Sequence, residues 1–182
     1  MNRTLLEEQL SSLPLLQYEF ISTDELVFSE NVRYICRTEC PMYGRTWACP
    51  PAVGTVEQCR EKCMEFTSGL LFSTVTEVSD IANIEETLST RAPHEAITRR
   101  VRDLIAEQCG TVFALSTEAC AICEKCAYAE GKPCRHPERM FPCVESHGII
   151  VTDLAEKHGM DFFNGGNIVT WFSLILFSDD AG

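Results

Sequence analysis

Cys120-Ala-Ile-Cys123-Glu-Lys-Cys126, closed by Cys134, is the stretch around which the chain is organised. It follows Thr111-Val-Phe-Ala-Leu-Ser116, an apolar run that is typical of a buried strand. The chain leaves it through a polar segment rich in turn-forming residues. A rigid strand is therefore expected to deliver a loop on which the thiol groups converge.

The spacing of these cysteines is a ligand pattern. A C-x2-C-x2-C run with a more distant fourth cysteine is the usual thiolate arrangement for a [4Fe–4S] cluster, in which each iron takes one sulfur. Zinc sites usually bring cysteines in pairs from two separate places. Three thiols within seven residues favour several irons over one tetrahedral ion. Zinc is the alternative cofactor, and buried or disulfide-bonded cysteines are the third possibility.

A second cysteine group precedes the first in the chain, as Cys36-x3-Cys40-x8-Cys49-Pro-Pro51. Proline beside a ligand fixes φ and removes an amide donor that would need a partner. This spacing is less specific than C-x2-C-x2-C, but it supplies three further thiolates for a second cluster. The group is one thiolate short of the four that a cubane takes.

Cys143 is the best candidate for the missing ligand. It follows Pro142, lies outside any predicted helical face, and comes nine residues after Cys134. The expected ligand and cofactor-binding set is therefore Cys36, Cys40, Cys49, Cys120, Cys123, Cys126, Cys134 and Cys143. The alternative is that the fourth iron of the first group stays open and Cys143 is a bystander.

Three other cysteines are predicted to be core residues. Cys59 and Cys63 share one face of a helix that opens at Thr55 with a capping-box pattern. Cys109 lies on the apolar face of a second helix. Free cysteine packs as a small hydrophobe, so these thiols are not expected to bind metal.

The composition restricts the class of protein. The 182 residues include 15 Lys+Arg and 27 Asp+Glu, which gives a formal net charge of −12. An acidic chain is a poor partner for nucleic acid or an anionic membrane surface. The N-terminal residues lack the apolar core of a signal peptide, and the longest apolar run, 168–177, is too short to span a bilayer. Eleven cysteines without such signals predict a cytoplasmic, reducing location.

The patterns of hydrophobicity predict an α/β fold or an α+β sandwich, with about four main strands alternating with helices and the cysteine loops at one end of the sheet. We expect one iron–sulfur-binding domain over residues 1–182, in which residues 1–30 form a possible helical appendage. The acidic residues 179–182 are expected to be frayed. The main strands are predicted at residues 31–35, 69–78, 111–116 and 168–177, and a weaker signal covers 18–21.

Other polar residues give weaker signals. His94 and His158 lie near helix ends, where surface positions are expected, and His136 and His147 flank the metal loop as possible ligands or as neighbours of ligands. Tyr43 and Trp47 could shield a cluster or simply pack. A basic rim near Cys134 could raise a cluster potential, dock a redox partner, or only be solvated; it comprises Lys132, Arg135 and Arg139.

Taken together, the cysteine groups resemble a family of cysteine-rich, predicted metal-binding proteins. The resemblance runs from about residue 30 onward and implies iron–sulfur binding, without a substrate. Cys143 departs from the family pattern, in which serine is often expected at that position. The matching segments are Val32-Arg-Tyr-Ile-Cys36-x3-Cys40-x8-Cys49-Pro-Pro51, Gly54-Thr-Val-Glu57, Cys120-x2-Cys123-x2-Cys126-x7-Cys134-Arg-His-Pro137 and Glu145-Ser-His-Gly-Ile149.

Three functions agree with these observations. The first is an electron-transfer protein with one or two [4Fe–4S] clusters and a redox protein partner. The second is an enzyme in which an open iron of the three-cysteine group acts as a Lewis acid. The third is a zinc-stapled interaction module. The sequence assigns no catalytic residue and leaves the oligomeric state open.

Overall fold

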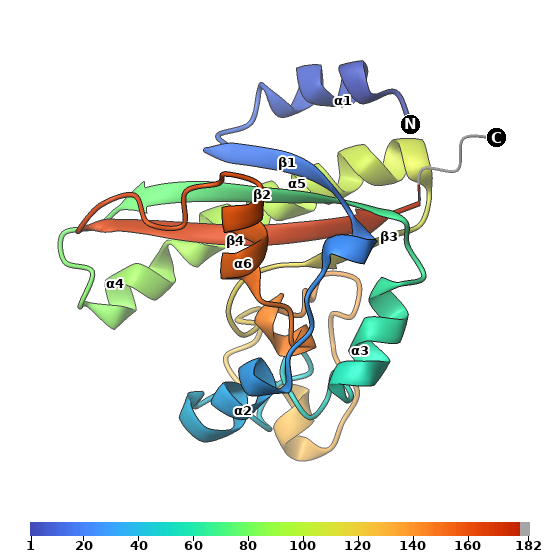
Figure 1. The fold of residues 1–182 in the computed structure, drawn as a ribbon. Coiled ribbons are helices and arrows are strands. Elements are labelled where there is room, and N and C mark those ends of the chain that lie inside the picture. Colours follow the sequence, from blue (N-terminus) through green and yellow to red (C-terminus); the bar gives the residue numbers. More distant parts are fainter. Residues whose placement is uncertain (179–182) are drawn as a thin grey trace.

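The computed structural model describes residues 1–178, so the acidic end expected to be frayed lies outside the described residues. The framework is a four-stranded antiparallel sheet in the order β1-β2-β4-β3 (Figure 1). The two longest strands pair along their whole length at the centre, with Leu71 opposite Leu174. The strands are β1 (Gln17–Ser22), β2 (Ser68–Glu77), β3 (Val112–Leu115) and β4 (Ile168–Phe177).

Both faces of the sheet are buried. Successive side chains of a strand point to opposite faces, so Leu174 and Leu176 enter one apolar cluster while Ile175 and Phe177 enter the other. All four are at most 1% exposed. A strand that is buried on both sides reads as a continuous apolar run, which is why 168–177 carries no polar alternation.

One face is covered by α1 (Arg3–Leu10) and α5 (Arg91–Cys109). Leu6 and Leu10 of α1 are buried against this face, and Asn2 caps the helix by accepting a hydrogen bond from the backbone N–H of Leu5 at 3.1 Å. Residues 1–30 thus contribute a helix and the edge strand β1 to the packed core. A short helix, α4 (Ile84–Ser89), precedes α5, and no helix within residues 1–178 is long and apolar enough to cross a membrane.

The opposite face is covered by α3 (Val56–Cys63) and α6 (Val151–Lys157). The predicted capping box at Thr55 is present, with Gln58 as its partner. Cys59 and Cys63 are 1% and 0% exposed, which confirms that they are core thiols. Cys109 is half-buried and packs against the α1/α5 side.

The strand predicted at residues 31–35 is wrong. These residues belong to α2 (Glu30–Glu39), whose N-cap is Ser29, with its side chain accepting a hydrogen bond from the Asn31 N–H at 3.2 Å. Alternation over only five residues does not distinguish a strand from a helix, and the N-cap at Ser29 stabilises the helix. The fourth strand is instead β1, over the weaker signal at 18–21. The mixed α/β class is confirmed, in its α+β form.

The surface position expected for His94 is also wrong. His94 is 1% exposed and lies in a buried hydrogen-bonded chain between α5 and the sheet. Thr74 Oγ1 lies 2.7 Å from His94 Nδ1, and Ser173 Oγ lies 2.8 Å from Nε2. Ser173 in turn donates to Ser116 Oγ at 3.1 Å. His158 is half-buried, with Nε2 3.0 Å from a carboxylate oxygen of Glu25.

Candidate metal centre

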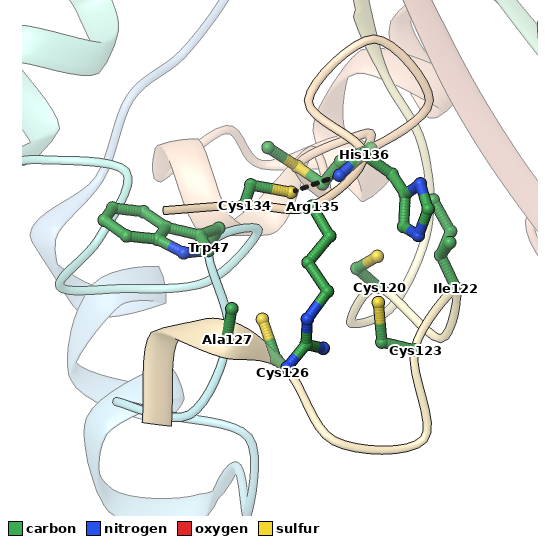
Figure 2. Close-up of a pocket in the computed structure, with 10 residues that line it drawn as sticks. Trp47, Cys120, Ile122, Cys123, Cys126, Ala127, Cys134, Arg135 and His136 are labelled. Carbon is green, nitrogen blue, oxygen red and sulfur yellow. Dashed lines mark hydrogen bonds between the residues drawn. The ribbon is translucent and has the colours of Figure 1, made fainter. Parts of the chain in front are cut away.

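The loop that leaves β3 forms one cysteine-lined pocket, the triplet pocket, around Cys120, Cys123, Cys126 and Cys134. All four thiol-bearing residues are half-buried. Figure 2 shows their sulfur atoms around one opening, with Trp47 at its edge. The remaining walls are Ile122, Ala127, Arg135, His136 and Met140.

Local structure explains how this loop turns back on itself. The short 3₁₀ turn Ala127–Glu130 begins directly after Cys126, and Gly131 then adopts φ +66, which favours glycine. The chain can therefore return toward the triplet, and Cys134 reaches the same pocket. The backbone N–H of His136 donates to Cys134 Sγ at 3.4 Å, which directs a donor at one of the pocket's sulfur atoms (Figure 2).

Arg135 occupies much of the triplet pocket. In Figure 2 its side chain lies between Cys126 on one side and Cys120 and Cys123 on the other. It donates to the carbonyl oxygen of Lys125 at 2.9 Å, and the space left is about 10 Å³. The rest of Arg135 is exposed to solvent.

Burial opposes ionisation of the thiol at the base of this loop. It raises the pKa of Cys120, and the nearby charge of Glu95 acts in the same direction. A desolvated thiol beside acidic groups ionises when a cation binds to it, because the metal takes the place of the proton. The donor set of this pocket therefore suits a positively charged metal group.

The second pocket, here the α2 pocket, brings Cys143 to the first cysteine group. Cys36, Cys40, Cys49 and Cys143 line one cavity of about 250 Å³. Cys36 and Cys40 come from the last turn and C-cap of α2, and Cys49 lies within the loop between α2 and α3. The fourth thiol of this site comes from a segment nearly a hundred residues later in the chain. The other lining residues are Tyr43, Pro50, Thr117, Glu118, Ala119, Glu145 and Ser146.

Backbone contacts hold these distant segments in place. The N–H of Ser29, just before α2, donates to the Gly148 carbonyl at 2.7 Å. Ser116 pairs with the segment of Cys143 through an isolated parallel bridge. The N–H of Ser146 donates to Cys143 Sγ at 3.2 Å. The end of β3, the start of α2 and the Cys143 turn are thereby joined around one cavity.

The electrostatics of the α2 pocket also favour a cation. Burial raises the pKa of Cys49 to about 11 and the pKa of Cys143 well above the ordinary thiol value. Burial raises the pKa of Cys36 as well, with the Cys40 thiol acting in the same direction. Thiols whose pKa is raised in this way become thiolates when a metal binds, with release of their protons.

Two carboxylates in this pocket were missed by the sequence analysis. Glu118 and Glu145 are solvent-accessible but line the cavity beside the cysteines. The surrounding wall desolvates Glu145 and raises its pKa, and the charge of Glu118 adds to the effect. Glu118 has φ +54, an uncommon conformation for a residue with a side chain. In the sequence, Glu145 stood out only as the first residue of the segment Glu145-Ser-His-Gly-Ile149, which carries part of the family resemblance. Nothing in the local sequence indicated Glu118.

The remaining candidate residues fall into those that line one of the two pockets and those that do not. Tyr43 lines the α2 pocket and Trp47 lines the triplet pocket, while Cys59 and Cys63 line neither. His136 lines the triplet pocket. His147 is 2% exposed and does not itself line the α2 pocket. It follows Ser146, which does, and its Nδ1 lies 3.1 Å from Ser146 Oγ. In the basic rim, Arg135 enters the pocket, whereas Lys132 pairs with Glu130 at 2.9 Å.

Across residues 1–178, no three His, Cys, Asp or Glu side chains form a ready-made site for a single metal ion. The thiols are instead distributed around the walls of two pockets. Four thiols per pocket, backbone N–H groups directed at two of the sulfurs, and desolvated walls fit a cluster that takes one thiolate per iron.

The fold and the two pockets define a cysteine-rich α+β protein equipped to bind metal. A family model described as "Predicted metal-binding protein (DUF2284)" matches residues 19–177, so the chain belongs to that family. The family resemblance inferred from the cysteine segments is thus confirmed. No curated protein and no solved structure matches the chain.

Proposed function

We propose that this protein binds two [4Fe–4S] clusters, one in each cysteine pocket, and transfers single electrons. The observation that carries the proposal is the position of Cys143. It shares the α2 pocket with Cys36, Cys40 and Cys49, which gives that pocket four thiols like the triplet pocket. A four-thiol set in each of two pockets matches the ligand requirement of two cubanes.

The ligand chemistry supports iron–sulfur clusters over zinc. Cys120, Cys123 and Cys126 lie on one seven-residue turn, and each can reach a different iron of one cluster. Structural zinc is usually held by two separated pairs that enclose one ion. Zinc is the runner-up cofactor, and it predicts colourless protein.

The cluster would supply reversible one-electron chemistry, and the chain supplies the surroundings. Trp47, Ile122 and Met140 provide apolar parts of the wall of the triplet pocket, and the His136 N–H donates to the sulfur of Cys134. Hydrogen bonds and exposure around the sulfurs are what set the reduction potential. The basic rim of Lys132, Arg135 and Arg139 around Cys134 is the proposed contact for an acidic redox protein. The high cysteine content, eleven in 182 residues, favours a reducing cytoplasm.

The test is metal analysis of anaerobically purified protein. The wild type should be brown and contain about eight irons with as many acid-labile sulfides, eight being two cubanes. Cys123→Ser and Cys143→Ser should each lose about half of the iron, from different pockets. Cys63→Ala is the matched control, because it removes a buried thiol outside both pockets at a cost on the order of 1 kcal/mol.

Three results would contradict the proposal. They are zinc in place of iron, wild-type iron content in Cys123→Ser, and iron loss in folded Cys63→Ala.

An enzyme is the second candidate, favoured by the cavity in the α2 pocket. The space of about 250 Å³ and the carboxylates of Glu118 and Glu145 leave room for a small molecule beside three cysteines. In that case Cys143→Ser should keep its iron and its spectrum. An added thiol or cyanide should then perturb the wild-type spectrum, because it reaches an open iron.

A further inference from the structure

The two cysteine pockets share a wall. Thr117, Glu118 and Ala119 line the α2 pocket, and the next residue, Cys120, lines the triplet pocket. Consecutive Cα atoms are about 3.8 Å apart across a trans peptide. The lining of one pocket therefore passes into the lining of the other across a single peptide bond.

A second segment joins the pockets in the same way. Trp47 lines the triplet pocket, and Cys49, two residues later, lines the α2 pocket. Between Tyr43 and Trp47, the buried Thr46 lines a groove whose other wall is formed by Cys120, Cys123 and Cys126. The loop that closes the first cysteine group thus also forms part of the surroundings of the triplet.

The shared wall is held by contacts from behind. Arg91 of α5 donates to the carbonyl oxygen of Ala119, which is 7% exposed. The Ser116 hydroxyl, just before the wall, accepts from Ser173 at 3.1 Å, and the Ser116 N–H donates to the Pro142 carbonyl at 2.9 Å. On the other side, Trp47 Nε1 donates to the Lys132 carbonyl at 3.0 Å. These contacts fix the separation between the two thiol sets.

We propose that the two sites act as one electron-transfer pair, with residues 117–120 and the loop from Trp47 to Cys49 as the path between them. This inference rests on the proposed function. A one-electron donor reduces one site. The electron then moves through the shared wall, so that the first site is oxidised again and the second is reduced, and no bond or proton changes place.

Magnetic coupling tests this arrangement, because two reduced clusters this close each carry an unpaired spin that perturbs the other. Fully reduced wild type, prepared with excess dithionite, should give a broadened and split EPR spectrum. Cys123→Ser and Cys40→Ser should each give a simple single-cluster spectrum, from the α2 pocket and the triplet pocket respectively. The wild-type spectrum should differ from the sum of these two.

A wild-type spectrum equal to that sum, with both clusters reduced, would overturn the inference. Recording the wild-type EPR spectrum at two microwave frequencies tests the coupling without variants. A splitting caused by spin–spin coupling has the same width in magnetic-field units at both frequencies. Iron analysis of the same samples distinguishes failure of the coupled pair from failure of the two-cluster function. About eight irons with additive spectra reject only the coupled pair, whereas far fewer irons reject the two-cluster function itself.

Discussion

Arg91 contacts the wall between the pockets from behind, through its bond to the Ala119 carbonyl. Its side chain is 12% exposed, and Nε lies 3.6 Å from a carboxylate oxygen of Glu95. Arg99, one helical turn beyond Glu95, lies 3.7 Å from the other oxygen of the same carboxylate. The guanidinium group of Arg91 therefore places a positive charge directly behind Ala119. In a partly buried setting such a charge acts over several ångströms.

Arg91→Gln is therefore expected to lower the reduction potentials of both clusters. The added electron loses a favourable interaction with the guanidinium, and the shift should be on the order of tens of millivolts. An EPR-monitored potentiometric titration measures it. Arg100→Gln removes the same charge from the exposed side of the same helix and serves as the control. Equal shifts in the two variants would mean that Arg91 has no special influence on the sites.

His94 is the second residue with a consequence for the whole fold. Since Ser173 donates to Ser116, the His94 Nε2–H donates to Ser173, and Nδ1 accepts from the Thr74 hydroxyl. This pattern requires the neutral ring. Burial lowers the pKa of His94 to about 4, well below its ordinary value of 6.5.

The pH dependence of stability follows from that shift. The unfolded chain takes up a proton at His94 as the pH falls below 6.5, whereas the folded chain does so only near pH 4. The stabilisation is therefore complete above pH 6.5 and is lost between pH 6.5 and 4. His94→Gln should be less stable than wild type at pH 7.5, by a difference that shrinks by about 1 kcal/mol at pH 5.5. Urea unfolding at both pH values measures this; a constant difference would contradict it.

Among the helices, α2 is the one that carries two of the proposed ligands, Cys36 and Cys40. Within the described chain, none of its ten residues is fully buried, and Tyr34 and Ile35 are both 57% exposed. An isolated helix of this length is marginal in water. It is held by the Ser29 cap at its start and by the bond from Arg33 Nη1 to the Gly54 carbonyl at 2.7 Å, and the thiols at its end, Cys36 and Cys40, line the α2 pocket.

Loss of metal from the α2 pocket should therefore loosen this helix. In Cys143→Ser, amide hydrogen exchange in α2 is expected to be much faster than in the loaded wild type, while β4 stays protected. Cys123→Ser, which removes only the triplet site, is the matched control and should keep α2 protected. If α2 exchanges at the same rate in all three proteins, its order does not depend on the α2 pocket.

At the scale of the whole molecule, the core and the metal sites are largely separate. The sheet buries an apolar cluster on each face, and the larger of the two includes Phe172, Leu174 and Leu176 of β4. Of the eight proposed ligands, none belongs to either cluster. Small zinc domains differ, because their folding depends on the metal.

We therefore expect the sheet to persist without metal. Protein stripped of iron by an anaerobic chelator should keep its β-sheet circular dichroism and unfold in urea in one cooperative transition. Its unfolding midpoint should be lower than that of the loaded protein, because ligands that bind only the folded state stabilise it. Broad, non-cooperative unfolding of the stripped protein would show that the clusters hold the core together.

The sequence alone determined the features that arise from local interactions. The strand over 168–177, the capping box at Thr55 and the core positions of Cys59 and Cys63 follow from residues within a few positions of one another. The spacing of the triplet likewise predicts a metal-binding loop before any fold is known. The same local signals failed at residues 31–35, where five alternating residues fitted a strand and the cap at Ser29 made a helix.

Only the tertiary structure decided which distant residues meet. The pairing of Ser116 with the Cys143 segment carries that thiol to the α2 pocket, and the turn at Glu118 places its carboxylate there. The bond from Arg91 to Ala119 and the burial of His94 depend on how α5 docks on the sheet. The physical reason is that these contacts join positions far apart in the chain, and sequence spacing constrains only neighbours along it.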